Sequence, residues 1–199
     1  MVLDIIAVVL CYLIGSISFS IAIAKWVKGI DIRQHGSGNA GATNTLRVLG
    51  KGPGIVVFFL DIAKGVAAIF LGNALSDNEW IPVLCGLAVI IGHNWPIWFR
   101  FKGGKGIATT VGVIATLALV PALCAGVVAV VCIVLTRYVS LGSLLFAAFT
   151  PIFIILFDYS LPLLSVALVI CAFAFIRHRT NIVKLMQGTE NKLGAKKGA

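Results

Sequence analysis

Residues 107–135 read IATTVGVIATLALVPALCAGVVAVVCIVL and contain no charged side chain. A membrane-spanning helix needs about 20 predominantly apolar residues, so this run is typical of an integral membrane protein. Its length fits either one long span or two short ones. Pro121 removes a helix hydrogen bond near the middle of the run and favours a break there. The number of crossings made by this run decides the topology of the whole chain.

The composition of the 199 residues agrees with a membrane protein. Hydrophobic residues make up 60%, charged residues 12%, and the mean hydropathy is +1.07, which excludes an ordinary soluble domain. The net charge of +9 does not indicate a nucleic-acid partner, because Lys and Arg punctuate apolar runs instead of forming a stripe. All five cysteines lie inside apolar runs and are interpreted as small buried hydrophobic residues.

Further apolar runs predict the other spans, and polar loops separate them. The first run has no basic region before it, so we expect a retained span and not a cleaved signal peptide. The expected spans are Leu3–Ala24, Gly54–Leu75, Trp80 to about Ile91 or on through Phe99, Ser143–Phe157 and Leu163–Ile176. The expected loops are Gly29–Pro53, Ser76–Glu79, Arg100–Gly106, Arg137–Gly142 and Asp158–Pro162.

Charge settles whether residues 107–135 cross once or twice. Cytoplasmic flanks carry the Lys and Arg residues. A double crossing with a turn at Pro121 puts every Lys and Arg outside the spans on one side, and only acidic residues on the other. We therefore predict an all-α protein with seven transmembrane helices, an outside N-terminus, a cytoplasmic C-terminus and one polytopic domain over 1–199. Each half of the run has only about 14 residues, roughly 21 Å of helix, which is short for a ~30 Å hydrocarbon core.

The most polar stretch is GSGNAGATNTLR, residues 36–47. Its glycines Gly36, Gly38 and Gly41 permit positive φ, and successive N–H groups in such a turn can form an anion-binding nest. Arg47 adds a guanidinium fork that suits phosphate. The alternative is a plain polar loop between two helices. The side chains expected to add hydroxyl and amide groups are Ser37, Asn39, Thr43 and Asn44.

A second polar cluster joins Gly92-His93-Asn94 to FKGGKG, residues 101–106, which leads directly into an apolar helix. Glycines at a helix N-terminus present N–H groups and the positive end of the helix dipole, as in phosphate sites. Lys102 and Lys105 add positive charge; the alternative is that these lysines anchor lipid headgroups. The glycines expected to hold phosphate are Gly103, Gly104 and Gly106.

Smaller polar groups remain open to two interpretations each. Ser140 and Ser143 either cap a helix or belong to the site, and the RHRTN motif at 177–181 either complements a helix dipole or binds an anion. Asp61 and Lys64 lie three residues apart inside a predicted span and form either a structural ion pair or, through Lys64, part of the substrate site.

The sequence offers no Ser/His/Asp arrangement and no metal-ligand spacing, so we expect no metal and no cofactor. The inventory consists of anion-binding donors and cations with one or two histidines. A transporter for a phosphate-bearing solute could use the same loops, but its spans would need a polar route. A lipid-binding scaffold would explain the basic face but not two glycine nests.

The strings GSGNAGATNTLR, DIAKG, GHNWPIWFRFKGGKG and RHRTN together resemble the bacterial acyl-phosphate-dependent glycerol-3-phosphate acyltransferases over essentially the whole chain. The resemblance implies acyl transfer from acyl phosphate to the 1-position of glycerol 3-phosphate at the cytoplasmic face of the bacterial inner membrane, within membrane lipid. One departure is Ala40, where proline is expected in many members. The resemblance implies functional positions at Ser37, Arg47, Lys105, Ser143, His178 and Asn181.

The expected site combines these positions with the polar loops. Acyl phosphate is already activated, so no enzyme nucleophile is required, and the hydroxyl proton goes either to His178 or to a phosphate oxygen of the donor. No histidine begins the H-x₄-D motif of acyl-CoA-dependent relatives. We expect catalytic roles for Ser37, Lys105 and His178. We expect substrate binding by Gly38, Asn39, Gly41, Thr43, Asn44, Arg47, His93, Gly103, Gly104, Gly106, Ser143 and Asn181.

Overall fold

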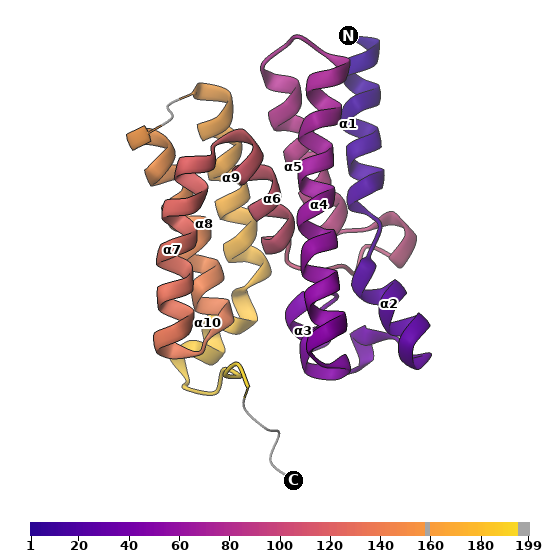
Figure 1. The fold of residues 1–199 in the computed structure, drawn as a ribbon, viewed down its shortest axis with the longest axis vertical. Coiled ribbons are helices and arrows are strands. Elements are labelled where there is room, and N and C mark those ends of the chain that lie inside the picture. The colour runs from indigo at the N-terminus through magenta and orange to yellow at the C-terminus, as the bar shows by residue number, and fades with distance from the viewer. Residues whose placement is uncertain (158–159, 195–199) are drawn as a thin grey trace. The chain divides into compact units, whose positions relative to one another are not determined.

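The computed structural model describes residues 1–157 and 160–194, and these residues are helical with connecting turns. The chain separates into two compact units, residues 1–117 and residues 118–199. Figure 1 shows the helices of both units.

Unit 1 is organised around α4 (Lys51–Leu75), which contacts α1 (Val2–Gly15), α5 (Trp80–Asn94) and α6 (Ile107–Leu117). The same helix also contacts two shorter ones, α2 (Phe19–Lys28) and α3 (Ala42–Leu49). Single 3₁₀ turns, η1 (Ile32–Gln34) and η2 (Ile97–Phe99), lie in the connections. In Figure 1, α4 runs the length of this unit. It is the scaffold from which the polar loops extend.

The first apolar run differs from the expected single helix, because it breaks at residues 16–18 into α1 and α2. Taken together, Val2–Lys28 is apolar enough to cross a membrane. Ser18 is extended at the start of α2, and the Ser16 hydroxyl donates back to Tyr12 O at 2.9 Å. The carbonyls left at the break, Gly15 O and Ile17 O, accept from Lys64 Nζ of α4 at 3.1 and 3.0 Å. A side chain from another helix therefore makes the break possible.

Two glycines let α1 and α5 approach each other backbone to backbone. A Cβ atom on Gly15 would collide with Val89 O, and one on Gly92 would collide with Tyr12 O. Only glycine fits where helix backbones lie this close, as in other membrane helix pairs. The contact holds the C-terminal end of α5 against the break in the first apolar run. The polar residues His93 and Asn94 come directly after Gly92 and are the last two residues of α5.

Unit 2 contains α7 (Leu119–Thr136), α8 (Val139–Phe157), α9 (Leu161–Arg177) and α10 (Arg179–Met186). Helix α8 contacts both α7 and α9, and α10 contacts α8 and α9. Much of α7 is exposed apolar surface; Val134 is 71% exposed. Such a surface suits lipid chains.

The apolar run 107–135 is broken, as expected, but at Ala118 and not at Pro121. Its parts are α6, with 11 residues, and α7, with 18, where two equal halves were expected. Pro121 lies in the first turn of α7, where the missing N–H has no helix carbonyl to reach. The expected position of the turn is therefore wrong, because the proline can sit inside the start of the next helix.

Other boundaries also differ from expectation. Helix α3 lies inside the predicted loop 29–53, and α10 follows the last expected span after a bend of 60° from α9. Helix α8 begins at Val139, inside the predicted loop 137–142. Part of the predicted turn Asp158–Pro162 lies outside the described residues, and Leu161 and Pro162 already belong to α9.

The described helices include five that are long and apolar enough to span a membrane, or six if the bent pair α9–α10 is one span. Helix α6 is apolar but shorter. The class of all-helical membrane protein is confirmed, whereas the count of seven spans stays a prediction.

We expect Gly92→Ala to lower the free energy of unfolding by about 1–3 kcal/mol, because its methyl group forces α1 and α5 apart. Gly126→Ala, in α7, is the matched control, since a Cβ there meets nothing within 4 Å. Thermal unfolding in detergent measures both. Equal melting temperatures for the two variants would contradict the close helix contact.

Candidate active site

The first glycine loop, residues 36–41, is held in shape by Asn44 at the start of α3. Asn44 Nδ2 donates to Ile32 O at 3.1 Å and His35 O at 2.9 Å, and its Oδ1 accepts from Ser37 N at 2.8 Å. The side chain is 1% exposed. Three hydrogen bonds occupy this amide, so the structure gives Asn44 a defined role in shaping the loop. Its predicted direct contact with substrate stays a prediction.

The glycines of this loop provide its turns. Gly36 and Gly38 have φ of 64° and 74°, which confirms the expected positive values, whereas Gly41 is extended at the N-cap of α3. Gly38 N donates to His35 O and Gly41 N to Asn39 O, both at 3.1 Å. These N–H groups therefore close the loop on itself.

Polar side chains of the first loop and α3 lie at the surface. Ser37 and Arg47 are exposed, and Asn39 and Thr43 are half-buried. Because the N–H groups of Ser37, Gly38 and Gly41 are hydrogen-bonded within the loop, an anion would meet side chains here more than a backbone nest.

The second glycine loop, residues 101–106, folds back onto the end of α5. Gly103 N donates to Asn94 O at 3.3 Å and Gly104 N to His93 O at 3.1 Å, so these carbonyls at the helix end are satisfied by loop glycines. Gly106 has φ of 80° and leads into α6. Lys105, half-buried, lies between the folded glycines and the helix N-terminus.

The two glycine loops lie against each other. Arg33 Nη1 donates to Phe99 O at 2.9 Å, and its guanidinium also binds the Asp31 carboxylate. This guanidinium holds the pKa of Asp31 below its usual value. A Cβ on Gly104 would lie 2.6 Å from Ala40 O of the first loop. Sequence reasoning missed Arg33, although an Asp-x-Arg pair in a polar connection could have suggested a brace.

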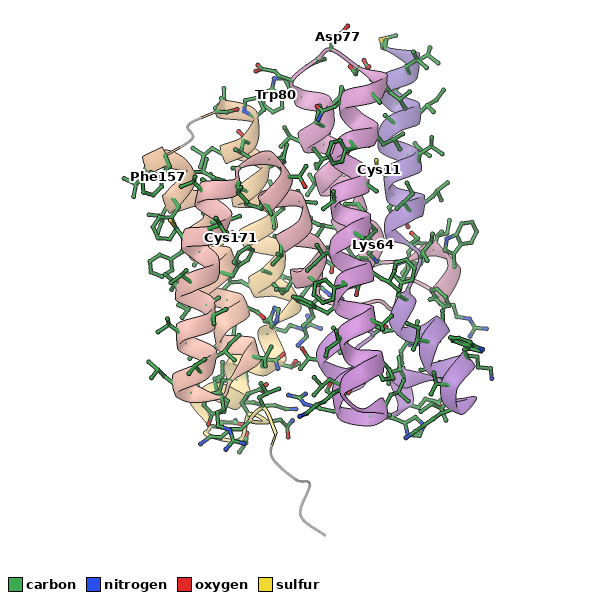
Figure 2. All side chains as sticks on the ribbon, viewed as in Figure 1. Cys11, Lys64, Asp77, Trp80, Phe157 and Cys171 are labelled. Carbon is green, nitrogen blue, oxygen red and sulfur yellow. The ribbon has the colours of Figure 1, made fainter. Side chains whose placement is uncertain are left out.

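Beneath the loops lies a buried cluster of three charged or titratable side chains, Asp61, Lys64 and His93. Lys64 Nζ is 2.9 Å from Asp61 Oδ1 and 2.9 Å from His93 Nδ1, and the Asp61–His93 distance is 3.4 Å. Figure 2 labels Lys64 on α4. The expected Asp61–Lys64 ion pair is therefore present. His93 was predicted to bind substrate, and it is only 7% exposed.

In unit 2, His178 lies at the bend between α9 and α10. Its Nδ1 is 2.8 Å from Ala174 O. A carbonyl oxygen only accepts, so Nδ1 carries the hydrogen and Nε2 is the acceptor in the neutral ring. Ser143, on α8, donates to Val139 O at 2.8 Å within its own helix.

Asn181, on α10, donates to Glu190 Oε1 at 2.8 Å, and Ser140 Oγ lies 3.0 Å from the same oxygen. The segment after α10 is also bound by Arg137, which donates twice to Leu193 O and accepts from Leu193 N. Glu190 is buried, and sequence reasoning gave it no role. Its position as a lone carboxylate in a basic segment was the available signal.

The predicted residues thus fall into two sets. Unit 1 brings together the residues of the two glycine loops, and unit 2 contains the rest. The set in unit 1 is Ser37, Gly38, Asn39, Gly41, Thr43, Asn44, Arg47, His93, Gly103, Gly104, Lys105 and Gly106, and the set in unit 2 is Ser143, His178 and Asn181.

Long apolar helices with exposed apolar surface indicate an integral membrane protein, and glycine loops with nearby cations suit an anionic ligand. Comparison with known proteins identifies the class further. Residues 5–188 match the family described as glycerol-3-phosphate acyltransferase. Proteins called glycerol-3-phosphate acyltransferase from Shouchella clausii and Halalkalibacterium halodurans are 57% and 53% identical. Their alignments cover 98% and 94% of this chain and 99% and 93% of theirs.

A crystal structure of PlsY (YgiH), an integral membrane glycerol 3-phosphate acyltransferase in its glycerol 3-phosphate form, is also similar. It shares 40% identity with a TM-score of 0.91, over 96% of each chain. The lysophosphatidic acid form of that protein gives a TM-score of 0.88, at 40% identity over 96% of this chain and 95% of that one. The chain therefore belongs to the glycerol-3-phosphate acyltransferase family. The transporter and scaffold alternatives fall away.

We expect Asn44→Ala to lower the free energy of unfolding by about 1–3 kcal/mol, because three backbone groups of the first glycine loop lose their partner. Asn73→Ala, an exposed asparagine on α4, is the matched control and should be close to neutral. Thermal unfolding and limited proteolysis between residues 32 and 41 measure the effect. An Asn44→Ala protein as stable and protease-resistant as the control would show that the clamp contributes little.

Proposed function

We propose that this acyltransferase moves a fatty acyl group from acyl phosphate to the 1-hydroxyl of glycerol 3-phosphate. The hydroxyl oxygen attacks the acyl carbon, the bond from that carbon to the phosphate oxygen breaks, and inorganic phosphate leaves with the electron pair. The products are lysophosphatidate and phosphate. No acyl group is attached to the enzyme, because an acyl phosphate is already activated.

The observation that carries this proposal is the contact between the two glycine loops in unit 1. Each loop has one cation nearby in the chain: Arg47 lies in the last turn of α3, which follows the first loop, and Lys105 lies in the second loop, before α6. Both substrates bear phosphate, and a pair of adjacent cationic loops suits two phosphate groups that must be held close together.

Within this site we assign the charge-bearing roles to side chains. Arg47 and Lys105 bind phosphate oxygens, and Lys105 also stabilises the negative charge that develops on the leaving phosphate. Ser37, exposed on the first loop, donates a hydrogen bond to the reacting groups. The neighbouring residues proposed to line the substrate are Gly38, Asn39, Gly41, Thr43, Gly103, Gly104 and Gly106.

We assign His178, Ser143 and Asn181 to glycerol 3-phosphate. With Nδ1 hydrogen-bonded to Ala174 O, the neutral His178 ring offers Nε2 as an acceptor, which suits a hydroxyl group. The proton of the attacking 1-hydroxyl passes to a phosphate oxygen of the donor, while His178 Nε2 accepts a hydrogen bond from the 2-hydroxyl and so orients the glycerol. A glycerol hydroxyl positioned in this way needs little further activation toward an acyl phosphate.

We also propose seven crossings of the bacterial inner membrane, with the N-terminus outside and the glycine loops on the cytoplasmic face. Under this topology α6 is the short crossing, buried among other parts of the protein or within thinned bilayer. The charge distribution supports the proposal, because Asp77 and Glu79 lie between α4 and α5, opposite the basic loops.

The donor is tested by assaying purified protein in lipid with palmitoyl phosphate and glycerol 3-phosphate. We expect lysophosphatidate formation that chelators leave unchanged and that inorganic phosphate inhibits, since phosphate is a product with the same charge as the donor headgroup. Palmitoyl-CoA should give no product, because its bulky leaving group carries a pantetheine arm. Robust turnover with palmitoyl-CoA, or loss of activity on chelation, would refute the assigned donor.

Topology is tested in a variant from which the five native cysteines have been removed. A cysteine at Asp77 should react with a membrane-impermeant maleimide added outside intact cells, and a cysteine at Lys192 should react only after the membrane is opened. The physical reason is that the charge bias puts these positions on opposite faces. Labelling of the Lys192 position from outside would refute the seven-span arrangement.

A further inference from the structure

The buried cluster of Asp61, Lys64 and His93 lies in the membrane-spanning part of unit 1, and none of the steps proposed above uses its side chains. Lys64 Nζ has three N–H groups but four acceptor atoms within 3.1 Å, including Gly15 O and Ile17 O. Either one N–H is shared, or His93 donates from Nδ1 to Asp61. In both arrangements the His93 ring is fixed at its Nδ1 edge.

The opposite edge of the same ring faces the glycine loops. A Cβ on Gly104 would collide with His93 Nε2 and come within 2.9 Å of Cε1, so the loop backbone lies directly on this edge. Ala40 O of the first loop lies next to the same point. One imidazole ring therefore separates the charged cluster on α4 from the place where the two loops meet.

Lys105 follows Gly104 in the chain, so the position of Gly104 sets where the Lys105 backbone begins. The Gly104 N–H is bonded to His93 O, and the Gly104 Cα rests on the His93 ring. The loop is thus held by the backbone of His93 from one direction and by its side chain from another. A shift of the ring would move the loop that carries the cation.

A contribution to folding stability does not by itself explain why this buried ionisable cluster is present. Replacing a buried ion pair by well-packed apolar residues is often neutral or stabilising, and ionisable groups inside a membrane usually serve a function. The backbone break after α1 explains two of the Lys64 contacts. It does not explain why a histidine, with one nitrogen toward Lys64 and the other toward Gly104, completes the cluster.

We propose that His93 is a positioning residue, held by Asp61 and Lys64, that sets the place of the second glycine loop and through it of Lys105. This inference rests on the proposed role of Lys105 in binding phosphate. Substrate need not touch His93. The ring acts as a spacer of fixed orientation between a charged pair that cannot move and a loop that bears the working cation.

Two substitutions distinguish a His93 that positions the loop from a His93 that only accepts a hydrogen bond from Lys64. His93→Asn keeps a polar atom near the Nδ1 position but removes the ring edge under Gly104. His93→Gln can reach the Nε2 position. If His93 positions the loop, we expect His93→Asn to lower kcat/KM for glycerol 3-phosphate at least about tenfold, and His93→Gln to lose less. If His93 only provides a hydrogen-bond partner for Lys64, His93→Gln should lose more activity than His93→Asn.

A double-mutant cycle with Lys105→Ala provides the decisive measurement. If His93 acts through Lys105, its substitution should cost less than about threefold once Lys105 is absent, because the residue it positions is gone. A substitution that merely reduces the folded fraction lowers activity by the same factor in both backgrounds. Gly126→Ala is the control, because residue 126 is far from both loops in the sequence and a Cβ there meets nothing within 4 Å. Its activity shows how much kcat/KM varies between preparations of a harmless variant.

Equal losses in both backgrounds, or a His93→Asn protein more active than His93→Gln, would overturn the proposal. If His93→Asn does not fold, the cycle is completed with His93→Gln. Wild-type protein inactive with palmitoyl phosphate would contradict the proposed donor and not this inference, and the cycle would then use the donor that the wild type accepts.

Discussion

The interaction on which unit 1 depends is the set of hydrogen bonds from the Lys64 ammonium group to two carbonyls of a broken helix. Inside an apolar layer, backbone groups that lose their helical partner have no water to replace it, and each costs several kcal/mol. Lys64 reaches Gly15 O and Ile17 O, while Asp61 balances its charge. The break after α1 turns the chain into α2, which carries it toward the first glycine loop. A residue on α4 thereby determines the path of a segment far away in sequence.

The glycines of the site contribute shape more than binding groups. Their N–H groups are largely used to close the loops, as with Gly38 and His35 O, or Gly104 and His93 O. The missing Cβ atoms then allow backbone to rest on side chain, as Gly104 does on His93. Under the proposed function, this division leaves the binding of phosphate charge to Arg47 and Lys105. A phosphate group needs fixed cations, because flexible ones would have to be ordered at each turnover.

Hydropathy predicted most of the fold, since α4, α5, α8 and α9 lie close to the expected apolar runs. It could not predict the break at residues 16–18, because the compensating donor comes from another helix. Nor does anything local mark Leu117 as the end of α6, and Pro121 was a misleading signal. For the site, the glycine loops were visible as composition. Arg33 and Glu190 were missed because they bind groups distant in sequence, Phe99 O in one case and the Ser140 hydroxyl in the other.

The contact between Gly104 and the His93 ring also has a consequence for protein engineering. The two positions share one volume, so neither can be varied freely while the other keeps its native residue. A library that randomises position 104 alone will return almost only glycine, and that outcome would be mistaken for a demand of the chemistry. Joint randomisation of both positions would reveal pairs, with a smaller side chain at 93 and a larger one at 104, subject to the room that Ala40 O leaves. Steric coupling of this kind makes a pair of residues the smallest unit that can be redesigned.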